Sequence, residues 1–220
     1  MNSTIDSKLI GEAWPAVQPF ENLQIYGSVE LDPRGEFVVR SYVSFTLTYT
    51  AGRYGIDDSG AIRVSFRAVG DWGRLQTHDP AGPNFVSART SSRAKLILDA
   101  SPSGMSPRPR NKCLTVRVAG GYLEEGEGIT VVFGDTFQGS PGLKLQTFAE
   151  SAFEFKVSVD PCATGHFVPL DEPLEIAIVP DEPTVCTLRR CPLHHPGSPR
   201  EGQLYLPGPD LLLWIAEARR

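Results

Sequence analysis

The feature that most constrains this chain is a repeated alternation of apolar and polar side chains. In the segment Val43–Tyr49, apolar residues occupy the odd positions, whereas serine and threonine occupy the even positions. Successive side chains of a β-strand point to opposite faces, so this segment predicts a strand with one buried and one solvated face. The same alternation recurs at residues 62–68, 114–118, 153–159 and 174–178.

Shorter apolar segments add further strands and bring the predicted number to about nine. They lie at residues 23–29, 96–98, 129–133 and 143–145. Clusters such as Asp57-Asp58-Ser59-Gly60 and Ser140-Pro141-Gly142 are typical of the turns between strands. Strands with one buried face favour antiparallel sheets, and two such sheets packed together bury both apolar faces. The sequence therefore predicts an all-β fold, an antiparallel β-sandwich.

The extent of the alternation predicts three parts of the chain. Residues 1–20 form a lead segment, residues 21–180 form the sandwich domain, and residues 181–220 form an irregular proline-rich tail. Prolines in the tail break any long element. They are Pro183, Pro192, Pro196, Pro199, Pro207 and Pro209. The final segment, Asp210–Arg220, has an acidic start and a basic end, which favours a short terminal helix.

The composition excludes several classes of protein. The chain has 220 residues, a formal net charge of −5 and 40% hydrophobic residues, which is typical of a globular domain. No basic patch is evident, so we expect no nucleic-acid partner. No stretch approaches the roughly 20 apolar residues of a membrane helix, and the first 15 residues do not resemble a secretory signal. We expect a cytoplasmic protein without a membrane partner, whose four cysteines are reduced.

Several motifs in sequence order, spread over residues 23–179, carry a family resemblance. The first group is Ala51–Gly60, followed by Gly70–Gln76 and Asp79-Pro80. The second group is Lys112-Cys113-Leu114 with Ile129–Asp135, and the third is Gly139–Phe148 with Phe153-Glu154-Phe155 and Val159-Asp160-Pro161. In these motifs the chain resembles the β-rich N-terminal region of the domain-of-unknown-function 3604 family.

The resemblance implies that family members contain more than the sandwich domain. Longer members of that family look as if they carry, after the β-rich region, a domain similar to metal-dependent hydrolases of the PHP type. Its metal ligands lie downstream, and the histidines here, His78, His166, His194 and His195, match no such motif. The resemblance therefore brings no hydrolytic activity to this chain. The proline-rich end is what a frameshift or an early stop would leave, so we expect a truncated form, which reading the downstream DNA in all frames tests.

The candidate ligand-binding residues lie in two loops between predicted strands. They are Arg53, Tyr54, Asp57 and Asp58 in the first loop, and Asp71, Trp72 and Gln76 in the second. Loops on a rigid scaffold commonly carry binding residues, and an aromatic ring beside polar groups can stack on a sugar. We predict that these residues line one rim of the sandwich. The alternative is that the aspartates only close turns and that Trp72 covers the core.

No pattern in the chain predicts a catalytic, metal or cofactor site. Turn aspartates can supply oxygens to Ca²⁺, but their spacing here matches no Ca²⁺-binding loop. Cys186, Cys191, His194 and His195 are more widely spaced than the ligands of structural zinc sites. Cys113 lies on the polar phase of an alternating strand with no histidine beside it in sequence, which favours a structural thiol. We therefore predict no catalytic residue, no metal and no cofactor.

The sequence leaves three functions open. The leading one is a non-catalytic sandwich module that serves as an accessory or interface domain, with a hydrolase-type domain or another copy of itself as partner. The second is a stand-alone module that binds a small carbohydrate-like ligand, with Tyr54 and Trp72 stacking on it. The third is a small hydrolase that uses the loop carboxylates, although the sequence cannot supply the carboxylate separation which that chemistry requires.

Overall fold

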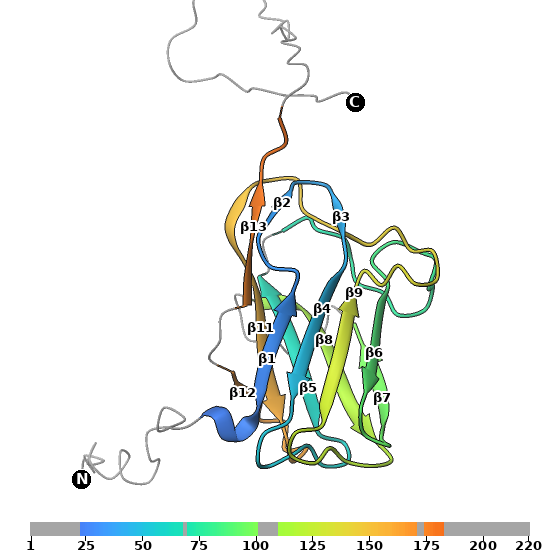
Figure 1. The fold of residues 1–220 in the computed structure, drawn as a ribbon, viewed down its shortest axis with the longest axis vertical. Helices are drawn as coiled ribbons and strands as arrows, with labels where there is room; N and C mark the ends of the chain where they lie inside the picture. Colours follow the sequence, from blue (N-terminus) through green and yellow to red (C-terminus); the bar gives the residue numbers. More distant parts are fainter. Residues whose placement is uncertain (1–22, 68–69, 101–109, 171–173, 183–220) are drawn as a thin grey trace, which may run out of the picture. The chain divides into compact units, whose positions relative to one another are not determined.

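The structure is a computed structural model that describes residues 23–67, 70–100, 110–170 and 174–182. Within these ranges, a short 3-10 helix, η1 (Leu23–Tyr26), precedes thirteen β-strands (Figure 1). The longer strands, of five residues or more, are β1 (Ser28–Asp32), β4 (Phe45–Thr50), β5 (Ala61–Arg67), β6 (Val86–Thr90), β7 (Lys95–Asp99), β8 (Arg110–Ala119), β9 (Gly128–Phe133), β11 (Glu150–Asp160) and β13 (Leu174–Val179). The shorter strands are β2 (Glu36–Val38), β3 (Tyr42–Val43), β10 (Leu143–Lys144) and β12 (Val168–Pro169). Each of the nine predicted segments overlaps a strand, whereas β2, β6 and β12 were not predicted.

The strands form two main sheets and one short pair. One sheet has the order β1-β4-β9-β6, and the other has the order β2-β13-β11-β5-β8-β7, with β12 beside β11. The short pair is β10-β3. The pairs are antiparallel except for β13 and β2, which run parallel with Ala177 opposite Glu36. The predicted all-β sandwich is confirmed, and this one parallel pair is its departure from a purely antiparallel arrangement.

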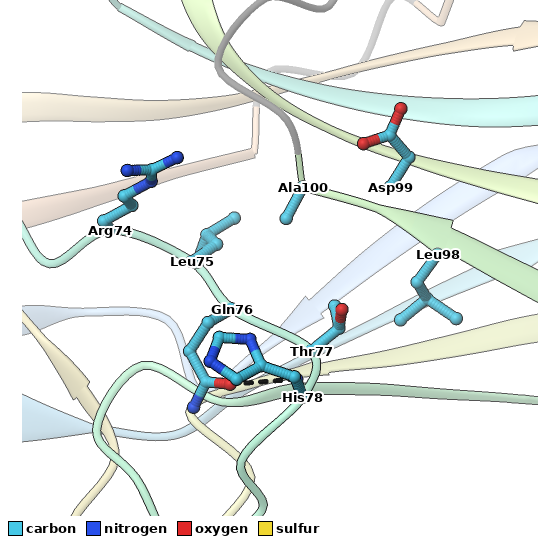
Figure 2. Close-up of a pocket in the computed structure, with 8 residues that line it drawn as sticks. All are labelled: Arg74, Leu75, Gln76, Thr77, His78, Leu98, Asp99 and Ala100. Carbon is cyan, nitrogen blue, oxygen red and sulfur yellow. Dashed lines mark hydrogen bonds between the residues drawn. The ribbon is translucent and has the colours of Figure 1, made fainter.

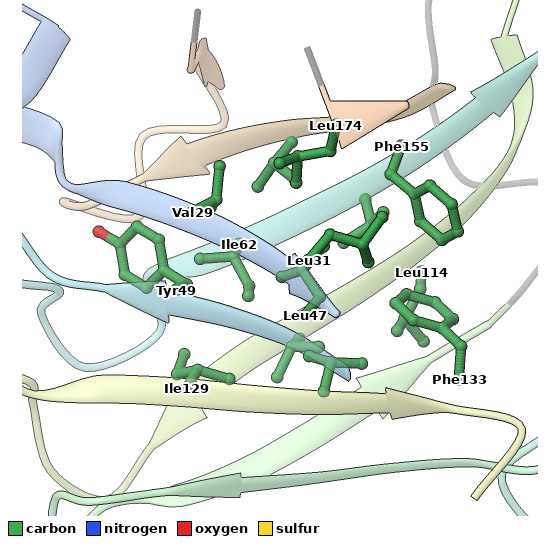
Figure 3. Packing of buried hydrophobic residues seen from close by; sticks show 14 of the residues in the cluster. Val29, Leu31, Leu47, Tyr49, Ile62, Leu114, Ile129, Phe133, Phe155 and Leu174 are labelled. Atoms are coloured by element: carbon green, nitrogen blue, oxygen red, sulfur yellow. The ribbon is translucent and has the colours of Figure 1, made fainter. Parts of the chain in front are cut away.

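Most apolar residues of the alternating segments are buried in the core, and most polar residues between them are in contact with solvent. In β4, Phe45, Leu47 and Tyr49 are fully buried, while the threonines between them are partly exposed. Figure 3 shows buried side chains of β1, β4 and β9 facing those of β5, β8, β11 and β13. Full burial of an aliphatic or phenylalanine side chain contributes roughly 1.5–3 kcal/mol. The core between the two sheets is therefore the main source of stability.

Two local predictions are corrected by the structure. Residues 23–29 were expected to form a strand, but the chain turns at Leu23–Tyr26 and β1 begins only at Ser28. The turn is closed by a hydrogen bond from Gly27 N to Gln24 O, and Gly27 has a φ of +112°, which suits glycine. Conversely, β6 was not predicted, because its sequence Val-Ser-Ala-Arg-Thr has only small or single apolar residues.

The chain divides between Pro180 and Asp181 into two units, and the described strands belong to the first. Residues 1–20 and residues 183–220 lie outside the described part of the chain. The predicted terminal helix and the candidate zinc ligands Cys186, Cys191, His194 and His195 fall there too. Among the described residues, no helix has the length and apolar character needed to cross a membrane.

Candidate functional site

The predicted binding residues do not share one rim. Loop 51–60 joins the end of β4 to the start of β5, whereas segment 70–85 lies between the end of β5 and the start of β6. The seven residues of β5 separate the two, and a strand rises about 3.3 Å per residue. The loops therefore lie at opposite ends of the sandwich (Figure 1). The prediction of a single rim is wrong, because closeness in sequence does not imply closeness across a strand.

Trp72, at the end away from loop 51–60, is a core residue. Its side chain is 4% exposed, and its ring centroid lies 4.7 Å from that of Phe66 and 6.1 Å from that of Phe153. The Lys112 Nζ atom lies 4.8 Å from the indole centroid. A ligand cannot stack on this indole without displacing the core around it. The alternative prediction, that Trp72 covers the core, is the correct one.

The other two residues at this end hold their own segment in place. Asp71 accepts hydrogen bonds from Thr147 N (2.8 Å) and Thr147 Oγ1 (2.6 Å), and these bonds lower the pKa of the Asp71 carboxyl. Gln76 Nε2 donates to Asp79 O (2.7 Å). Gln76 Oε1 accepts from the backbone N–H groups of His78 (3.0 Å) and Asp79 (2.9 Å). Gln76 therefore serves the turn chemistry that was the alternative to binding, whereas Asp71 bonds its segment to Thr147, which is distant in sequence.

A partly open hollow lies beside Gln76, with a volume of about 470 Å³ (Figure 2). Its wall is formed by segment 74–78 on one side and the end of β7 on the other. The lining residues are Arg74, Leu75, Gln76, Thr77, His78, Leu98, Asp99 and Ala100. Figure 2 shows that the Gln76 amide is bonded to the His78 backbone. The Gln76 side chain therefore stabilises the turn that forms this wall of the hollow.

At the opposite end, loop 51–60 packs against the loop between β8 and β9. Ile56 and Leu123, both buried, form an antiparallel bridge in which Ile56 N donates to Leu123 O (3.0 Å) and Leu123 N donates to Ile56 O (2.8 Å). Asp58 Oδ1 also accepts a hydrogen bond from Gly120 N (2.7 Å). This pairing brings together the exposed residues Arg53, Tyr54, Asp57, Asp58, Tyr122, Glu124 and Glu125, which we name the tyrosine surface.

The backbone beneath the tyrosine surface is fixed by hydrogen bonds to neighbouring loops. Asp57 N donates to Pro161 O (2.8 Å), and Ser59 N donates to Val118 O (2.9 Å). Gly55 has a φ of +61°, and a Cβ atom at this position would lie 2.1 Å from Leu123 O. Only glycine permits so close an approach of the two loops. The backbone beneath the surface is therefore fixed by hydrogen bonds and close packing.

Two exposed tyrosines dominate this surface. Tyr54 is 59% exposed and Tyr122 is 58% exposed. The Tyr54 ring lies 5.6 Å from the Tyr26 ring at an interplanar angle of 48°. Tyr49 shows the contrasting case, because it is fully buried, donates from its hydroxyl to Tyr26 O (2.7 Å), and has a pKa that burial raises well above its usual range. The exposed rings have no such role in the core.

The carboxylates of the tyrosine surface have no cationic partner among the described residues. Within that part of the chain, the one ion pair is Arg67–Glu150, at 3.3 Å, at the other end of the sandwich. Asp57, Glu124 and Glu125 are exposed to solvent. In the described ranges, no three histidine, cysteine or acidic side chains come together as metal ligands would. The surface therefore offers hydrogen-bond acceptors and negative charge beside two aromatic rings.

The sequence predicted the residues that loop 51–60 contributes to this surface, but not those of the loop between β8 and β9. Arg53, Tyr54, Asp57 and Asp58 were predicted, but Tyr122 and its glutamate neighbours were not. The neighbouring sequence Gly126-Glu127-Gly128 predicts a turn, and it carries no signal of a site. The bridge between Ile56 and Leu123 joins segments far apart in sequence, so no local pattern reveals it.

Comparison with known proteins gives no family for this chain: no family model and no curated protein matches it. Two solved structures are similar in part. One is the cohesin module from a family 33 glycoside hydrolase of Clostridium perfringens, with 10% identity over 71% of this chain and 99% of that chain, and a TM-score of 0.39. The other is the CBM3a-L domain with flanking linkers from scaffoldin cipA of the Clostridium thermocellum cellulosome, with 17% identity over 70% of this chain and 95% of that chain, and a TM-score of 0.35. At these TM-scores the two structures carry no functional argument.

Proposed function

We propose that this chain is a non-catalytic β-sandwich module that docks a partner through the tyrosine surface. The observation that carries the proposal is the exposure of Tyr54 and Tyr122 on loops whose backbone is already fixed. Tyrosine is among the residues that contribute most to protein interfaces, because one ring offers a large contact area and a polar group. Pre-organised loops also lower the entropy cost of binding.

The partner we propose is a hydrolase-type domain of the kind found in longer members of the family that the sequence resembles. An accessory domain of this type needs a surface for docking rather than a reaction centre. The tyrosine surface provides aromatic contact area and solvent-exposed carboxylates, which can bond to donors on a partner. In this role the chain is an interface domain, and the chemistry belongs to the partner.

Binding of a purified PHP-like domain from a longer family member to the full chain tests this proposal. We expect the double variant Tyr54→Ala/Tyr122→Ala to bind at least about tenfold more weakly, because two interface aromatics are lost. The matched control is Tyr42→Ala, since Tyr42 is 47% exposed on β3 at the other end of the sandwich. Absence of binding by the unmodified chain, or an equal loss in the control, contradicts the proposal.

A second candidate is the binding of a carbohydrate-like ligand on the same surface. The observation that favours it is the placement of two exposed tyrosines on the same surface as exposed carboxylates, which supplies stacking surfaces and acceptors for hydroxyl groups. In this version Tyr122 takes the place of the buried Trp72. A glycan array and thermal-shift measurements, with and without Ca²⁺, test it. If no sugar binds or stabilises the chain, this candidate is removed.

A further inference from the structure

Strand β7 is an edge strand of the larger sheet in the described part of the chain. Among the described residues, β7 pairs only with β8, in a register that places Leu96 opposite Val118. None of the backbone hydrogen bonds between described residues outside the strand pairs involves residues 95–100. An edge strand in this state presents backbone N–H and C=O groups that can pair with another strand.

The outer face of β7 places an apolar side chain between two opposite charges. Lys95, Ile97 and Asp99 are exposed, and 52% of the Ile97 side chain is open to solvent. Leu96 and Leu98 are partly buried and pack against the core on the inner face. Charged side chains usually protect edge strands from pairing with another chain. The exposed isoleucine at the centre of β7 is instead an apolar surface that suits contact with a partner strand.

The hollow of Figure 2 borders the far end of the same strand. Leu98, Asp99 and Ala100 form one wall of it, facing segment 74–78. Its volume is about 470 Å³. Among the described residues, this end of β7 is therefore bordered by the hollow.

The sequence Lys95-Leu96-Ile97-Leu98-Asp99 is complementary to itself when two copies run antiparallel. With Ile97 opposite Ile97 of the second copy, Lys95 lies opposite Asp99 of that copy, and by symmetry the same pair forms again. Leu96 lies opposite Leu98 on the inner face. Opposite charges and apolar pairs directly across two strands are both stabilising. An Asp carboxylate accepts more than one hydrogen bond, so existing contacts of Asp99 do not prevent the pairing.

We propose that the chain forms a two-fold symmetric dimer in which β7 pairs antiparallel with β7 of a second copy, centred on Ile97. The pairing joins the larger sheets of two sandwiches into one continuous sheet. Because the same edge is used by both copies, the interface is closed and does not propagate into a filament. This dimer is independent of the tyrosine surface and of the partner proposed for it.

Charge substitutions at the two ends of β7 test the register in solution. Sedimentation equilibrium of the full chain is expected to show a dimer. Lys95→Asp places a carboxylate opposite Asp99 at each of the two symmetry-related positions and is expected to weaken dimerisation about tenfold. The double variant Lys95→Asp/Asp99→Lys restores opposite charges and is expected to recover the dimer. The control, Lys144→Asp on the exposed end of β10, is expected to leave it unchanged.

A disulfide trap tests the same dimer even when its affinity is low. The Cα atoms of directly opposite residues in an antiparallel pair lie about 4.5–5.5 Å apart, within the range that a disulfide bridges. In a Cys162→Ser background, which removes an exposed thiol, Ile97→Cys is expected to yield a covalent dimer under mild oxidation. The control is Phe137→Cys, at a site that is 92% exposed and away from β7. Circular dichroism confirms that each variant is folded.

Three results overturn the proposal. The first is a monomer at all concentrations together with no more cross-linking from Ile97→Cys than from the control. The second is a dimer whose dissociation constant Lys95→Asp leaves unchanged, since that dimer uses another face. The third is a double variant that dimerises no better than Lys95→Asp alone, because the predicted ion pairs would then be absent.

Discussion

At one end of the sandwich Tyr54 and Tyr122 extend into solvent, whereas at the other end Trp72 packs against Phe66 and Phe153. Both ends consist of loops rich in aspartate, glycine and aromatic residues. What differs is which side chain enters the space between the sheets. Loop 51–60 inserts Ile56 there and leaves its tyrosine outside, while segment 70–85 inserts the tryptophan. Loops of similar composition therefore leave aromatic rings exposed at one end and bury one at the other.

The polar side chains show the same contrast in a different way. Asp71 and Gln76 use their side chains to bond the backbone of their own end. At the tyrosine surface, Asp58 does the same with Gly120, but Asp57 and Glu125 are exposed acceptors. The end that carries the tyrosines therefore retains exposed polar groups, whereas the predicted polar groups of the other end are engaged in hydrogen bonds.

The largest expected effect separates the aromatic residues of the two ends. Trp72→Ala removes a buried ring from the aromatic cluster and is expected to lower the free energy of unfolding by about 3–5 kcal/mol. Tyr54→Ala removes an exposed ring that contacts the Tyr26 ring and is expected to change it by no more than about 1.5 kcal/mol. Guanidinium unfolding of both variants measures the difference. Similar losses in the two variants would show that the tyrosine is structural after all.

A pair of glycines sharpens the contrast within the loops of the tyrosine surface. Gly55 and Gly120 have φ values of +61° and +62°. Gly120→Ala meets no atom within 4 Å and is expected to cost about 1–2 kcal/mol from its backbone conformation alone. Gly55→Ala places a Cβ against Leu123 O and is expected to cost roughly 3 kcal/mol. Thermal unfolding of the two variants checks this order. Equal losses would mean that the two loops are not in close contact.

Gln76 provides the next comparison, between an engaged and a solvated polar side chain. Gln76→Ala removes the bonds to the backbone of His78 and Asp79 and is expected to lower the free energy of unfolding by about 1–2 kcal/mol. Arg53→Ala, at the tyrosine surface, is expected to change it by less than about 0.5 kcal/mol. Urea unfolding measures both. A large loss for the arginine variant would indicate a structural contact at the surface proposed for binding.

The smallest expected effect depends on pH. The hydrogen bonds from Thr147 lower the pKa of Asp71 below its ordinary value of 3.8, so the stability they supply is present above that value and is lost as the pH falls through the lowered pKa. Because Asp71 is largely exposed, Asp71→Asn is expected to cost less than about 1 kcal/mol at pH 7. The difference should vanish in strong acid. Unfolding curves at both pH values, repeated in a Thr147→Val background, check the sign and the partner.

The fold was predictable because its signal is local. The alternation in Val43–Tyr49 fixes which side chains face the core, whatever the rest of the chain does. The site was predictable only in part, because Tyr54 joins Tyr122 through a bridge between distant segments. Trp72 was ambiguous for a related reason. Its burial depends on how segment 70–85 lies over the ends of both sheets, and no pattern within the segment records that position.

The most direct test of the contrast between the two ends is an NMR map of the binding surface. Amide chemical shifts of the labelled chain are measured while the PHP-like domain is added. We expect the changes to concentrate at residues 53–58 and 120–127, with residues 70–80 unaffected. Chemical-shift changes centred on residues 70–80, with none at the tyrosine surface, would contradict the account.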